Sequence, residues 1–436
     1  MNKLLNHTHD PAARSWLESA NTLCDFPIQN LPMAVFRTAG SHEGFRGGVA
    51  IGDQVVDLAA LSAAGLLQGV ALQACTVCTQ STLNDLMALG PAAWQALRHA
   101  LFALLHVQAT PAQQQTLRAC LVPQSVVEYA VPARIGDYTD FYTSIHHARN
   151  MGRIVKPDDP LPANFQWLPI AYHGRASSVV VSGTPFHRPM GQSALPGGSQ
   201  PVYGPCARLD FELELGMFMG AGNALGQTIA LPDAENHIFG VCLLNDWSAR
   251  DIQFWEMTPL GPFLGKNFCT SISPWVVSLE ALVPFRLPFS RPAGEPQPLP
   301  YLDSPANRAQ GVFDIQLEVL IETPQQRARV LRTSFRHQYW TLAQMVAQHT
   351  MGGCNLRPGD LLGTGTISGP TAQEAGALVE LTQGGRKPLD LPGGEQRAFL
   401  HDGDSVVLRG WCEKPGAAPI GFGECRGTVL PALAGV

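Results

Sequence analysis

The order of apolar and polar residues predicts short elements in the first part of the chain. GGVAIGDQVVDLA (47–59) alternates on both sides of a Gly-Asp pair, which is typical of two strands joined by a tight turn. PAAWQALRHALFALL (91–105) predicts a helix with Pro91 in its first turn. The Gln- and Ala-rich stretch 109–115 is interpreted as a connector. The apolar stripe of the helix comprises Trp94, Leu97, Leu101, Leu104 and Leu105.

The pattern changes after about residue 125 to many short apolar runs separated by Gly and Pro. This spacing favours a β-sandwich or a rolled β-barrel over alternating strand–helix–strand units. Two short helices are predicted at 248–256 and 341–349, and the Pro-rich stretch 284–305 is interpreted as a long surface loop. The chain is therefore predicted to have an N-terminal domain, residues 1–120, and a larger domain, residues 121–436.

One alternating stretch, LDFELELG (209–216), raises a question about charge. In a strand, residues two apart point the same way, so one face would be apolar and the other would carry Asp210, Glu212 and Glu214. Neighbouring like charges are destabilising unless something positive lies against them. Taken alone, the stretch reads as a solvated sheet face, like FDIQLEVLI (313–321), which has the same alternation. The residues that surround it decide between the two interpretations.

Composition narrows the class of protein. Of 436 residues, 45% are hydrophobic and only 15% are charged, which is a globular composition. The net charge of −6 gives no basic surface for nucleic acid or anionic lipid. The sequence begins without the apolar core of a signal peptide, and no apolar run is long enough to span a bilayer. We expect a cytoplasmic protein that binds neither nucleic acid nor a membrane.

The ten cysteines include one C-x-x-C pair, Cys75 and Cys78. Such a pair is compatible with half of a zinc site or with a redox pair. A structural zinc site needs a second pair of ligands at similar spacing, and none follows. We interpret both residues as ordinary thiols.

Two further segments concentrate groups that carry chemistry. DYTDFYTSIHHARNMG (137–152) crowds acids, phenols and imidazoles into a few positions, unlike a packed core. IFGVCLLNDWSARDIQFWE (238–256) is an apolar run that ends at Asp246 and is followed by a helix with Ser248 near its N-cap. Arg250 and Gln253 lie three apart on that helix and so share a face, which suits an anionic, oxygen-rich ligand.

A third segment, PLGPFLGKNFCTS (259–271), places Lys266 among glycines and aromatic residues. Partial burial there is expected to lower its pKa, or to direct the ammonium at developing negative charge. Four carboxylates with few available His or Cys ligands indicate a hard cation, because oxygen-only sites select Ca²⁺ or Mg²⁺ over zinc. The predicted counter-charge of the alternating strand is such a cation against Glu212 and Glu214.

These motifs resemble those of the fumarylacetoacetase family, which catalyses the last step of tyrosine and phenylalanine catabolism. The resemblance runs from about Trp16 to the C-terminus. It implies a mainly β fold with some α: a small N-terminal SH3-like β-barrel and a C-terminal β-sandwich roll. The motifs are DFPIQNLP, GVAIGDQVVDLA, DYTDFYTS, YHGRASSVVVSGTP, NDWSARDIQ, PLGPFLGK, GCNLRPGDLLGTGTISGP and IGFGEC.

The resemblance implies two cation sites. Asp210 would lie outside both, beside the ligands or in solvent. The ligands implied for a divalent cation, usually Ca²⁺, are Asp140, Glu212, Glu214 and Asp246. The residues implied for an additional Mg²⁺ beside the last of these are Lys266 and Thr270.

The resemblance also implies the catalytic and substrate-binding residues of a β-diketone hydrolase. His147 would act as general base and Glu380 would orient it, whereas the neighbouring His146 receives no role. Arg250, Gln253 and Lys266 would bind substrate and stabilise the departing carbanion. Tyr142, Tyr172 and Thr366 would contact substrate.

Two positions depart from the family pattern and bear on substrate affinity. Lys156 stands where the family has a substrate-binding Arg, with Arg153 close by, and Lys cannot offer the bidentate fork of Arg. Met257 replaces a Tyr and removes a hydroxyl donor. We expect a homodimer that acts on a small β-diketo acid, as is typical of the family.

Two alternative functions remain open. The same fold hosts acylpyruvate hydrolases, decarboxylases and isomerases, so the fold alone does not choose the reaction. These relatives generally lack the N-terminal unit. A non-catalytic, metal-stabilised binding protein would use the carboxylates but not His147 and Glu380. A serine esterase finds no support, because no G-x-S-x-G motif is present.

Overall fold

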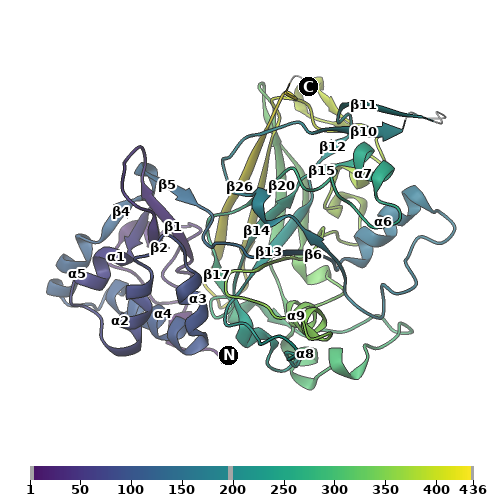
Figure 1. Ribbon diagram of the computed structural model, residues 1–436. Helices are drawn as coiled ribbons and strands as arrows, with labels where there is room; N and C mark the ends of the chain where they lie inside the picture. Colours follow the sequence, from purple (N-terminus) through teal and green to yellow (C-terminus); the bar gives the residue numbers. More distant parts are fainter. Residues whose placement is uncertain (1–3, 195–199, 434–436) are drawn as a thin grey trace.

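The computed structural model describes residues 4–194 and 200–433. Figure 1 shows a smaller N-terminal unit, in purple, beside a larger unit of long strands. The fold is mainly β with short helices, as predicted. Within the described ranges, no helix is both long enough and apolar enough to cross a membrane.

The N-terminal unit is built on an antiparallel sheet with the strand order β4-β3-β2-β1-β5. The predicted hairpin is confirmed: Ile51 pairs with Gln54, so Gly52 and Asp53 form a two-residue turn. Gly52 has a φ of +55°, which favours glycine. The strands are β1 (Met33–Thr38), β2 (Arg46–Ile51), β3 (Gln54–Asp57), β4 (Leu121–Pro123) and β5 (Val127–Ala130).

Five helices pack on this sheet (Figure 1). The helix predicted at residues 91–105 has these bounds, and its leucines are buried. The connector predicted at 109–115 is wrong: a helix begins at Pro111, because Thr110 and Gln113 form a reciprocal capping box. The helices are α1 (Leu58–Ala63), α2 (Gly69–Val77), α3 (Asn84–Leu89), α4 (Pro91–Leu105) and α5 (Pro111–Arg118).

The larger unit contains two packed sheets, in agreement with the predicted β-sandwich roll. One sheet has the order β7-β6-β22-β13-β14-β16-β8, and β17 also pairs with β14. Its strands are β6 (Tyr138–Tyr142), β7 (Ile170–Gly174), β8 (Val179–Val181), β13 (Leu213–Met219), β14 (Ile238–Asp246), β16 (Thr270–Ile272), β17 (Val277–Ser278) and β22 (Leu361–Gly363).

The second sheet has the order β21-β20-β25-β26-β9 and packs on β14 and β16 of the first. Four short strand pairs complete the unit. The strands of the second sheet are β9 (Phe186–His187), β20 (Gln316–Glu322), β21 (Arg327–Ser334), β25 (Ser405–Cys412) and β26 (Ile420–Leu430). The pairs are β10 (Met190–Ala194) with β11 (Pro201–Pro205), β12 (Leu209–Asp210) with β15 (Ser248–Ala249), β18 (Arg286–Leu287) with β19 (Val312–Phe313), and β23 (Leu389–Asp390) with β24 (Gln396–Arg397).

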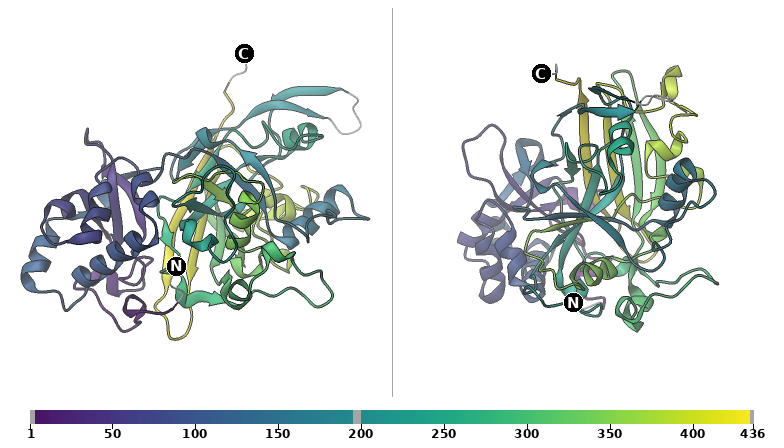
Figure 2. Two further views of the ribbon diagram at one scale, coloured as in Figure 1. Left: turned by 60° about the horizontal axis from the view of Figure 1, so that its bottom comes forward. Right: turned by 45° about the vertical axis from the view of Figure 1, so that its right-hand side comes forward.

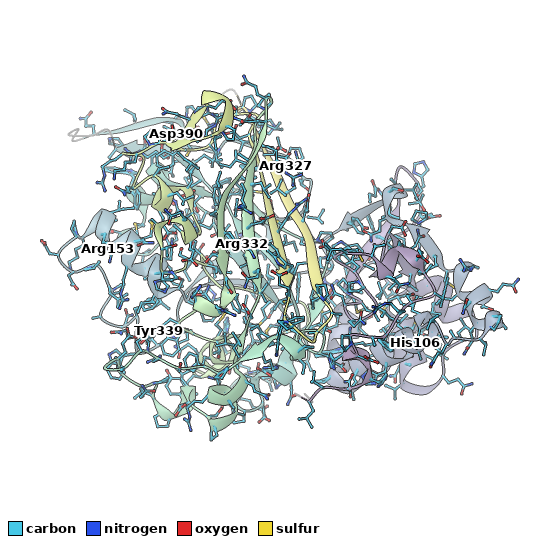
Figure 3. The ribbon with its side chains drawn as sticks, turned by 180° about the vertical axis from the view of Figure 1, so that it is seen from behind. His106, Arg153, Arg327, Arg332, Tyr339 and Asp390 are labelled. Carbon is cyan, nitrogen blue, oxygen red and sulfur yellow. The ribbon has the colours of Figure 1, made fainter. Side chains whose placement is uncertain are left out.

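The two alternating stretches have different environments. In β20, Leu317, Val319 and Ile321 are buried and the residues between them are half-buried, so this strand has the solvated face that its pattern predicts. Figure 3 shows the adjoining β21 from behind, with Arg327 and Arg332 on the same sheet. Residues 209–216 are instead buried throughout, and the strand is interrupted after β12. The solvated interpretation of 209–216 is therefore wrong.

Helices of the larger unit lie near the edges of the sheets (Figure 1). Both predicted helices are present, within two residues of the expected bounds. The N-cap of α7 is Ala249 rather than Ser248, whose hydroxyl donates to the carbonyl of Asp246. The stretch 284–305 includes the short strand β18 and so is not entirely loop. The helices are α6 (Ile145–Val155), α7 (Arg250–Glu256), α8 (Pro305–Gln310), α9 (Leu342–Thr350) and α10 (Leu378–Leu381).

Candidate active site

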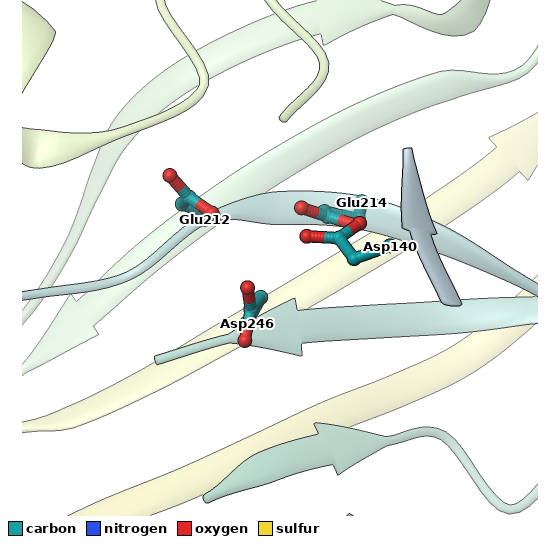
Figure 4. Close-up of side chains that lie close together, drawn as sticks. All are labelled: Asp140, Glu212, Glu214 and Asp246. Atoms are coloured by element: carbon teal, nitrogen blue, oxygen red, sulfur yellow. The ribbon is translucent and has the colours of Figure 1, made fainter. Parts of the chain in front are cut away.

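Four carboxylates from separate segments converge inside the larger unit. Asp140 lies on β6 and Asp246 ends β14, while Glu212 precedes β13 and Glu214 lies on it. One oxygen of each lies within 4.8 Å of the others (Figure 4). All four side chains are buried. We call these four residues the carboxylate cage.

Burial and mutual repulsion oppose full ionisation of the cage. Burial, followed by the charge of Asp246, raises the pKa of Asp140 well above its ordinary value. Burial and the neighbouring carboxylates, Asp140 first, do the same to the pKa of Glu214. Asp140 Oδ1 and Glu214 Oε1 are buried and accept no hydrogen bond. Two free oxygen ligands among four close carboxylates fit a hard divalent cation, which would hold them all ionised.

Glycine at position 363 leaves room behind the cage. Gly363, at the end of β22, pairs in register with Asp140. A Cβ at this position would lie 2.7 Å from Asp140 Oδ1 and 3.0 Å from Glu214 Oε2. No side chain fits there without displacing a cage carboxylate.

Two basic side chains border the cage on the side of Glu212. Lys266 Nζ donates to Glu212 Oε2 and, at 2.6 Å, to Asp246 Oδ2. Arg250 Nη2 forms an ion pair with Glu212 Oε1 at 2.8 Å. Burial opposes ionisation of Glu212, yet the charges of Lys266 and Arg250 outweigh it and hold the pKa of Glu212 below the ordinary value.

The expectation that Lys266 has a lowered pKa is wrong. Burial lowers the pKa of Lys266, but the carboxylates of Asp246 and Glu212 raise it further, to above the ordinary value of a lysine. The side chain therefore stays protonated. An ammonium has no lone pair, so Lys266 offers this region positive charge and N–H donors rather than a metal-ligand nitrogen.

Asp210 lies beside the cage and is fully buried, so it is not solvated. Arg250 Nε donates to Asp210 Oδ2 at 2.8 Å, and the backbone N–H groups of Leu378 and Val379 donate to the same carboxylate. Arg250 Nη1 donates to Gln253 Oε1 at 3.2 Å, as their shared helix face predicts. Asp210 thus fixes Arg250 and the first turn of α10 together.

His147 and Glu380 form a buried pair. His147 is in the first turn of α6, where Ser144 accepts its backbone N–H, and Glu380 lies on α10. His147 Nδ1 lies 2.7 Å from Glu380 Oε1, while Nε2 faces the cage at 3.9 Å from Glu212 Oε1. Burial opposes the ionised form of Glu380, but the interaction with His147 lowers the pKa of Glu380 overall. This geometry fixes one tautomer and leaves Nε2 as the base.

Two residues that the sequence analysis did not single out hold Glu380 in place. Ser368 Oγ donates to the Glu380 carboxylate at 2.9 Å, and Asn150 Nδ2 donates to Glu380 Oε2 at 2.8 Å. Asn150 lies three residues after His147, so both belong to one face of α6. That spacing is the only signal in the sequence that links Asn150 to the site.

Three tyrosines line the same region. The Tyr142 ring packs edge-on against His147, with ring centroids 5.3 Å apart. Tyr172 Oη donates to Asp246 Oδ2 at 3.1 Å. Tyr138 was not predicted as a site residue, but its hydroxyl is buried near the cage without a hydrogen bond. It lies two residues before Asp140 on β6, and this period of two on one strand was the available signal.

The remaining predicted residues divide into two groups. Thr270 donates to Asp246 Oδ1 at 3.3 Å, and the buried Thr366 lies beside Gly376, next to the Glu212–Ala377 bridge. Lys156 is 68% exposed and donates to Asp159, so the structure does not bring it to the cage. Met257, at the C-terminal end of α7, is also exposed.

The C-x-x-C pair lies far from this site, in the N-terminal unit. Cys75 and Cys78 are buried, and each thiol donates to a backbone carbonyl. Burial raises the pKa of Cys75 to about 12. In the described part of the chain, both are free thiols.

Together, a two-sheet fold, a buried carboxylate cage and an adjacent His–Glu pair define a class of metal-dependent hydrolases. Comparison with family models gives the family. Residues 29–132 match the fumarylacetoacetase N-terminal model, and residues 138–430 match the fumarylacetoacetate hydrolase C-terminal model. The chain belongs to the fumarylacetoacetase family, and the predicted resemblance is confirmed.

Curated relatives support this membership. A fumarylacetoacetase of Oryza sativa subsp. japonica is 49% identical over 415 residues, which is 94% of this chain and 95% of the relative. The Homo sapiens fumarylacetoacetase is 49% identical and covers 94% and 97%. A solved fumarylacetoacetate hydrolase from Exiguobacterium antarcticum has a TM-score of 0.50 at 14% identity, covering 92% of this chain and 99% of that chain. This last likeness concerns the fold alone.

Proposed function

We propose that the chain hydrolyses 4-fumarylacetoacetate to fumarate and acetoacetate, the last step of tyrosine and phenylalanine catabolism. The chain is a hydrolase of carbon–carbon bonds, like the fumarylacetoacetases that it matches over 94% of its length. One observation carries the mechanism: a base held by a carboxylate at 2.7 Å faces a buried carboxylate cage. A binding protein without catalysis has no need of this pair.

His147 and Glu380 supply the base for water. His147 Nε2 takes a proton from water as the water oxygen bonds to the fumaryl carbonyl carbon. Glu380 stabilises the imidazolium that forms, by the same logic as other carboxylate-oriented histidines. The carbon–carbon bond then breaks, its electron pair leaves with acetoacetate as an enolate, and a proton returns to that carbon. A positioned general base contributes roughly 10²–10⁴-fold.

We propose three donors that stabilise the negative charge, Arg250, Lys266 and Gln253. Arg250 Nη2 and the ammonium of Lys266 both contact Glu212. His147 Nε2 faces the same carboxylate. Gln253 is held by Arg250. We propose that these donors bind the oxyanion and the departing enolate, where loss of one donor typically costs about 10²–10³ in rate. The proposed substrate contacts are Tyr142, Tyr172 and Thr366. Lys156, which the family resemblance implies for the same role, is exposed and bound to Asp159 instead.

The cation proposed for the carboxylate cage is Ca²⁺, since oxygen-only ligands suit it. It would be held by Asp140, Glu212, Glu214 and Asp246. When bound, the cation would supply Lewis-acid chemistry to the β-diketone. Thr270 and Asp246 would contribute oxygens to a neighbouring Mg²⁺ site. Lys266 would take part there through its backbone carbonyl, because its ammonium is bound to carboxylates.

The test is an ultraviolet assay of the purified full chain with fumarylacetoacetate, with and without a chelator. We expect turnover that a chelator abolishes and that added Ca²⁺ restores. His147→Ala should remain folded and bind Ca²⁺, with the rate lost in kcat. No turnover of fumarylacetoacetate alongside activity on an acylpyruvate would assign the chain to that alternative reaction.

We also propose a homodimer formed through an exposed apolar patch. The patch lies on α7, the loop after it and the β10–β11 hairpin, which extends from the body in Figure 2. Trp255 Nε1 lies 3.4 Å from Gln192 Oε1 and links helix and hairpin. Large exposed apolar side chains grouped on neighbouring elements are typical of interfaces. Its exposed side chains are Val202, Tyr203, Trp255, Met257, Leu260, Phe263 and Leu264.

Sedimentation of Leu260→Glu tests the dimer. Leu260 is 97% exposed, so the substitution costs the monomer little. We expect a monomer for this variant and a dimer for the wild type and for a control, Leu225→Glu, at another exposed leucine. An unchanged dimer in Leu260→Glu would place the interface elsewhere.

We propose a cytoplasmic location, which the state of the cysteines supports. All ten cysteines lie in the described part of the chain and are free thiols. Reduced thiols are the rule in the cytosol. Every residue of the proposed chemistry lies between 121 and 436, so we propose that this part is the catalytic domain and that residues 1–120 support it.

A further inference from the structure

A cavity of about 200 Å³ reaches the carboxylate cage from the surface. It is several times the roughly 30 Å³ that one water occupies in the liquid, which is room for a small organic acid. Its inner wall includes Tyr138, Asp246 and Lys266, which are buried. Its wall also includes Arg175, which is exposed and so lies at the open end.

The position of this cavity assigns it to one half of the substrate. His147 faces Glu212 Oε1 and is not part of the cavity wall, whereas Lys266 binds the other oxygen of Glu212 and Asp246, which is itself part of the wall. Water activated by His147 attacks the fumaryl carbonyl. Lys266, which stabilises the departing enolate, is part of the wall. The cavity therefore lies on the leaving-group side, where the acetoacetate half with its terminal carboxylate belongs.

Arg175 is free to bind that carboxylate. Its Nε donates to Ser177 Oγ at 2.8 Å, which fixes the plane of the guanidinium. Its two terminal nitrogens make no hydrogen bond or ion pair within residues 4–194 and 200–433. A planar guanidinium presents two parallel N–H groups to a carboxylate, the geometry of the strongest charge-assisted pairs.

The residues that the family resemblance predicts for this role lie elsewhere. Lys156 is bound to Asp159 at 2.8 Å on the surface, and Met257 has no donor to offer. Neither is part of the cavity wall. Arg175 and Lys266 are the two cationic side chains of that wall, and Lys266 is already bound to carboxylates.

We propose that Arg175 is a specificity-determining residue that binds the terminal carboxylate of the acetoacetate half. This inference rests on the proposed hydrolysis of fumarylacetoacetate, and it adds the residue that recognises the acid at the leaving-group end. It explains how the chain selects a β-diketo acid over a neutral β-diketone although Lys156 and Met257 replace the Arg and Tyr of the family pattern.

The first experiment measures binding without turnover. The Ca²⁺-loaded full chain is titrated by calorimetry with acetoacetate and, separately, with acetylacetone, a β-diketone that has no carboxylate. In Arg175→Gln we expect acetoacetate to bind about 10- to 100-fold more weakly, the range for losing hydrogen bonds to a charged group. Acetylacetone should bind within about twofold of wild type. Equal effects on both ligands, or no effect on acetoacetate, would overturn the proposal.

The second experiment uses turnover of fumarylacetoacetate. Arg175→Gln should raise KM by the same factor and leave kcat within about threefold, because the contact is equal in ground and transition states. Arg175→Lys should recover only part of the loss, since lysine keeps the charge but not the fork. The matched control is Arg329→Gln, an exposed arginine on β21, which should match wild type. A loss confined to kcat would contradict the proposed contact.

The two experiments separate this proposal from the proposed function. Wild-type protein that does not hydrolyse fumarylacetoacetate would refute the function, yet the calorimetric comparison of acetoacetate with acetylacetone would still test Arg175. Conversely, wild-type turnover with an unaffected Arg175→Gln variant would refute the role of Arg175 alone.

Discussion

Ser368 and Asn150 determine how well Glu380 holds His147, because each donates to its carboxylate. Without Ser368, Glu380 Oε1 keeps only His147 and Oε2 keeps only Asn150, so the buried carboxylate is held by fewer hydrogen bonds and the base is less firmly oriented. For Ser368→Ala we expect kcat to fall by about 10-fold, with KM and Ca²⁺ affinity unchanged. Steady-state kinetics and calcium titration measure this, with Ser368→Thr restoring part of the rate.

The control for that prediction is Ser81→Ala, at an exposed serine of the N-terminal unit. It should leave kcat unchanged. A fall in Ca²⁺ affinity that parallels the fall in kcat in Ser368→Ala would show that the variant disturbs the cage rather than the His147–Glu380 pair.

Asp210 and Arg250 form a fully buried ion pair, and burial decides what its loss costs. Asp210→Asn removes the carboxylate that accepts from Arg250 Nε and weakens two backbone hydrogen bonds at α10. We expect the free energy of unfolding to fall by about 3–5 kcal/mol. The comparison is Asp303→Asn in the partly exposed pair with Arg308, where the loss should stay below about 1 kcal/mol. Denaturant unfolding of the Ca²⁺-loaded variants measures both, and equal losses would contradict the argument.

The residue types in the sequence were enough to predict the carboxylate cage. They were not enough to predict the residues that hold the neighbouring side chains in place. Asp140, Glu212, Glu214 and Asp246 stand in dense motifs, and the structure brings all four together. Ser368 gives no such signal, because a lone serine is common and its partnership depends on how the chain folds back. The pKa of Lys266 was predicted in the wrong direction, since burial is visible in the sequence pattern whereas the two carboxylates that bind the ammonium are not.

At the scale of elements, β22 depends on glycine at its last position. In Gly363→Ala the new methyl would lie 2.7 Å from Asp140 Oδ1, so the carboxylate must move. Such overpacking typically costs about 1–3 kcal/mol, which corresponds to a 10- to 100-fold loss of Ca²⁺ affinity. Calorimetric titration measures the affinity. Gly44→Ala, where the added methyl meets open space, should bind Ca²⁺ like wild type.

Element boundaries were predictable where local signals act alone. The helix α4 and the hairpin β2–β3 follow from a proline, a Gly-Asp turn and periodicity, and they were predicted within a residue or two. The helix α5 was missed because its polar composition hides a capping box at Thr110. The alternation of 209–216 alone did not distinguish a solvated face from a buried one, and the neighbouring motifs were needed to favour a cation. The basic side chains Lys266 and Arg250, which come from distant segments, were not predicted as counter-charges of this strand.

At the scale of the whole molecule, one hydrophobic cluster contains residues of both the N-terminal unit and the larger unit. Met33 of β1 pairs with Val276, and Trp94 of α4 packs edge-on against Phe239 at 5.3 Å. A polar cluster of Glu280, Asn6, His9 and His99 also joins the two units. Glu280 of the larger unit accepts hydrogen bonds from N-terminal side chains, and its backbone accepts from His9 in the 3-10 helix His7–His9. The two units should therefore unfold together.

The polar cluster makes this junction sensitive to acid through His9. His9 Nδ1 accepts the Asn6 N–H at 2.9 Å, and Nε2 donates to the Glu280 carbonyl at 2.8 Å, so the ring is held neutral. Burial, reinforced by the charge of Arg98, lowers the pKa of His9 below 6.5, although Glu280 acts in the opposite direction. The unfolded chain then binds a proton more readily than the folded one. The stabilising effect of His9 is complete above pH 6.5 and is lost as the pH falls below it.

Denaturant unfolding of wild type and His9→Gln between pH 5 and 8 tests this effect. We expect the variant to be less stable above pH 6.5, and the gap to narrow as the pH falls, because only the wild type has the His9 imidazole to protonate. Val276→Ala, which removes packing at the same junction without a titratable group, should keep a constant gap. A His9→Gln gap that is equally constant would mean that His9 joins the two units by packing alone, and that acid weakens the molecule elsewhere.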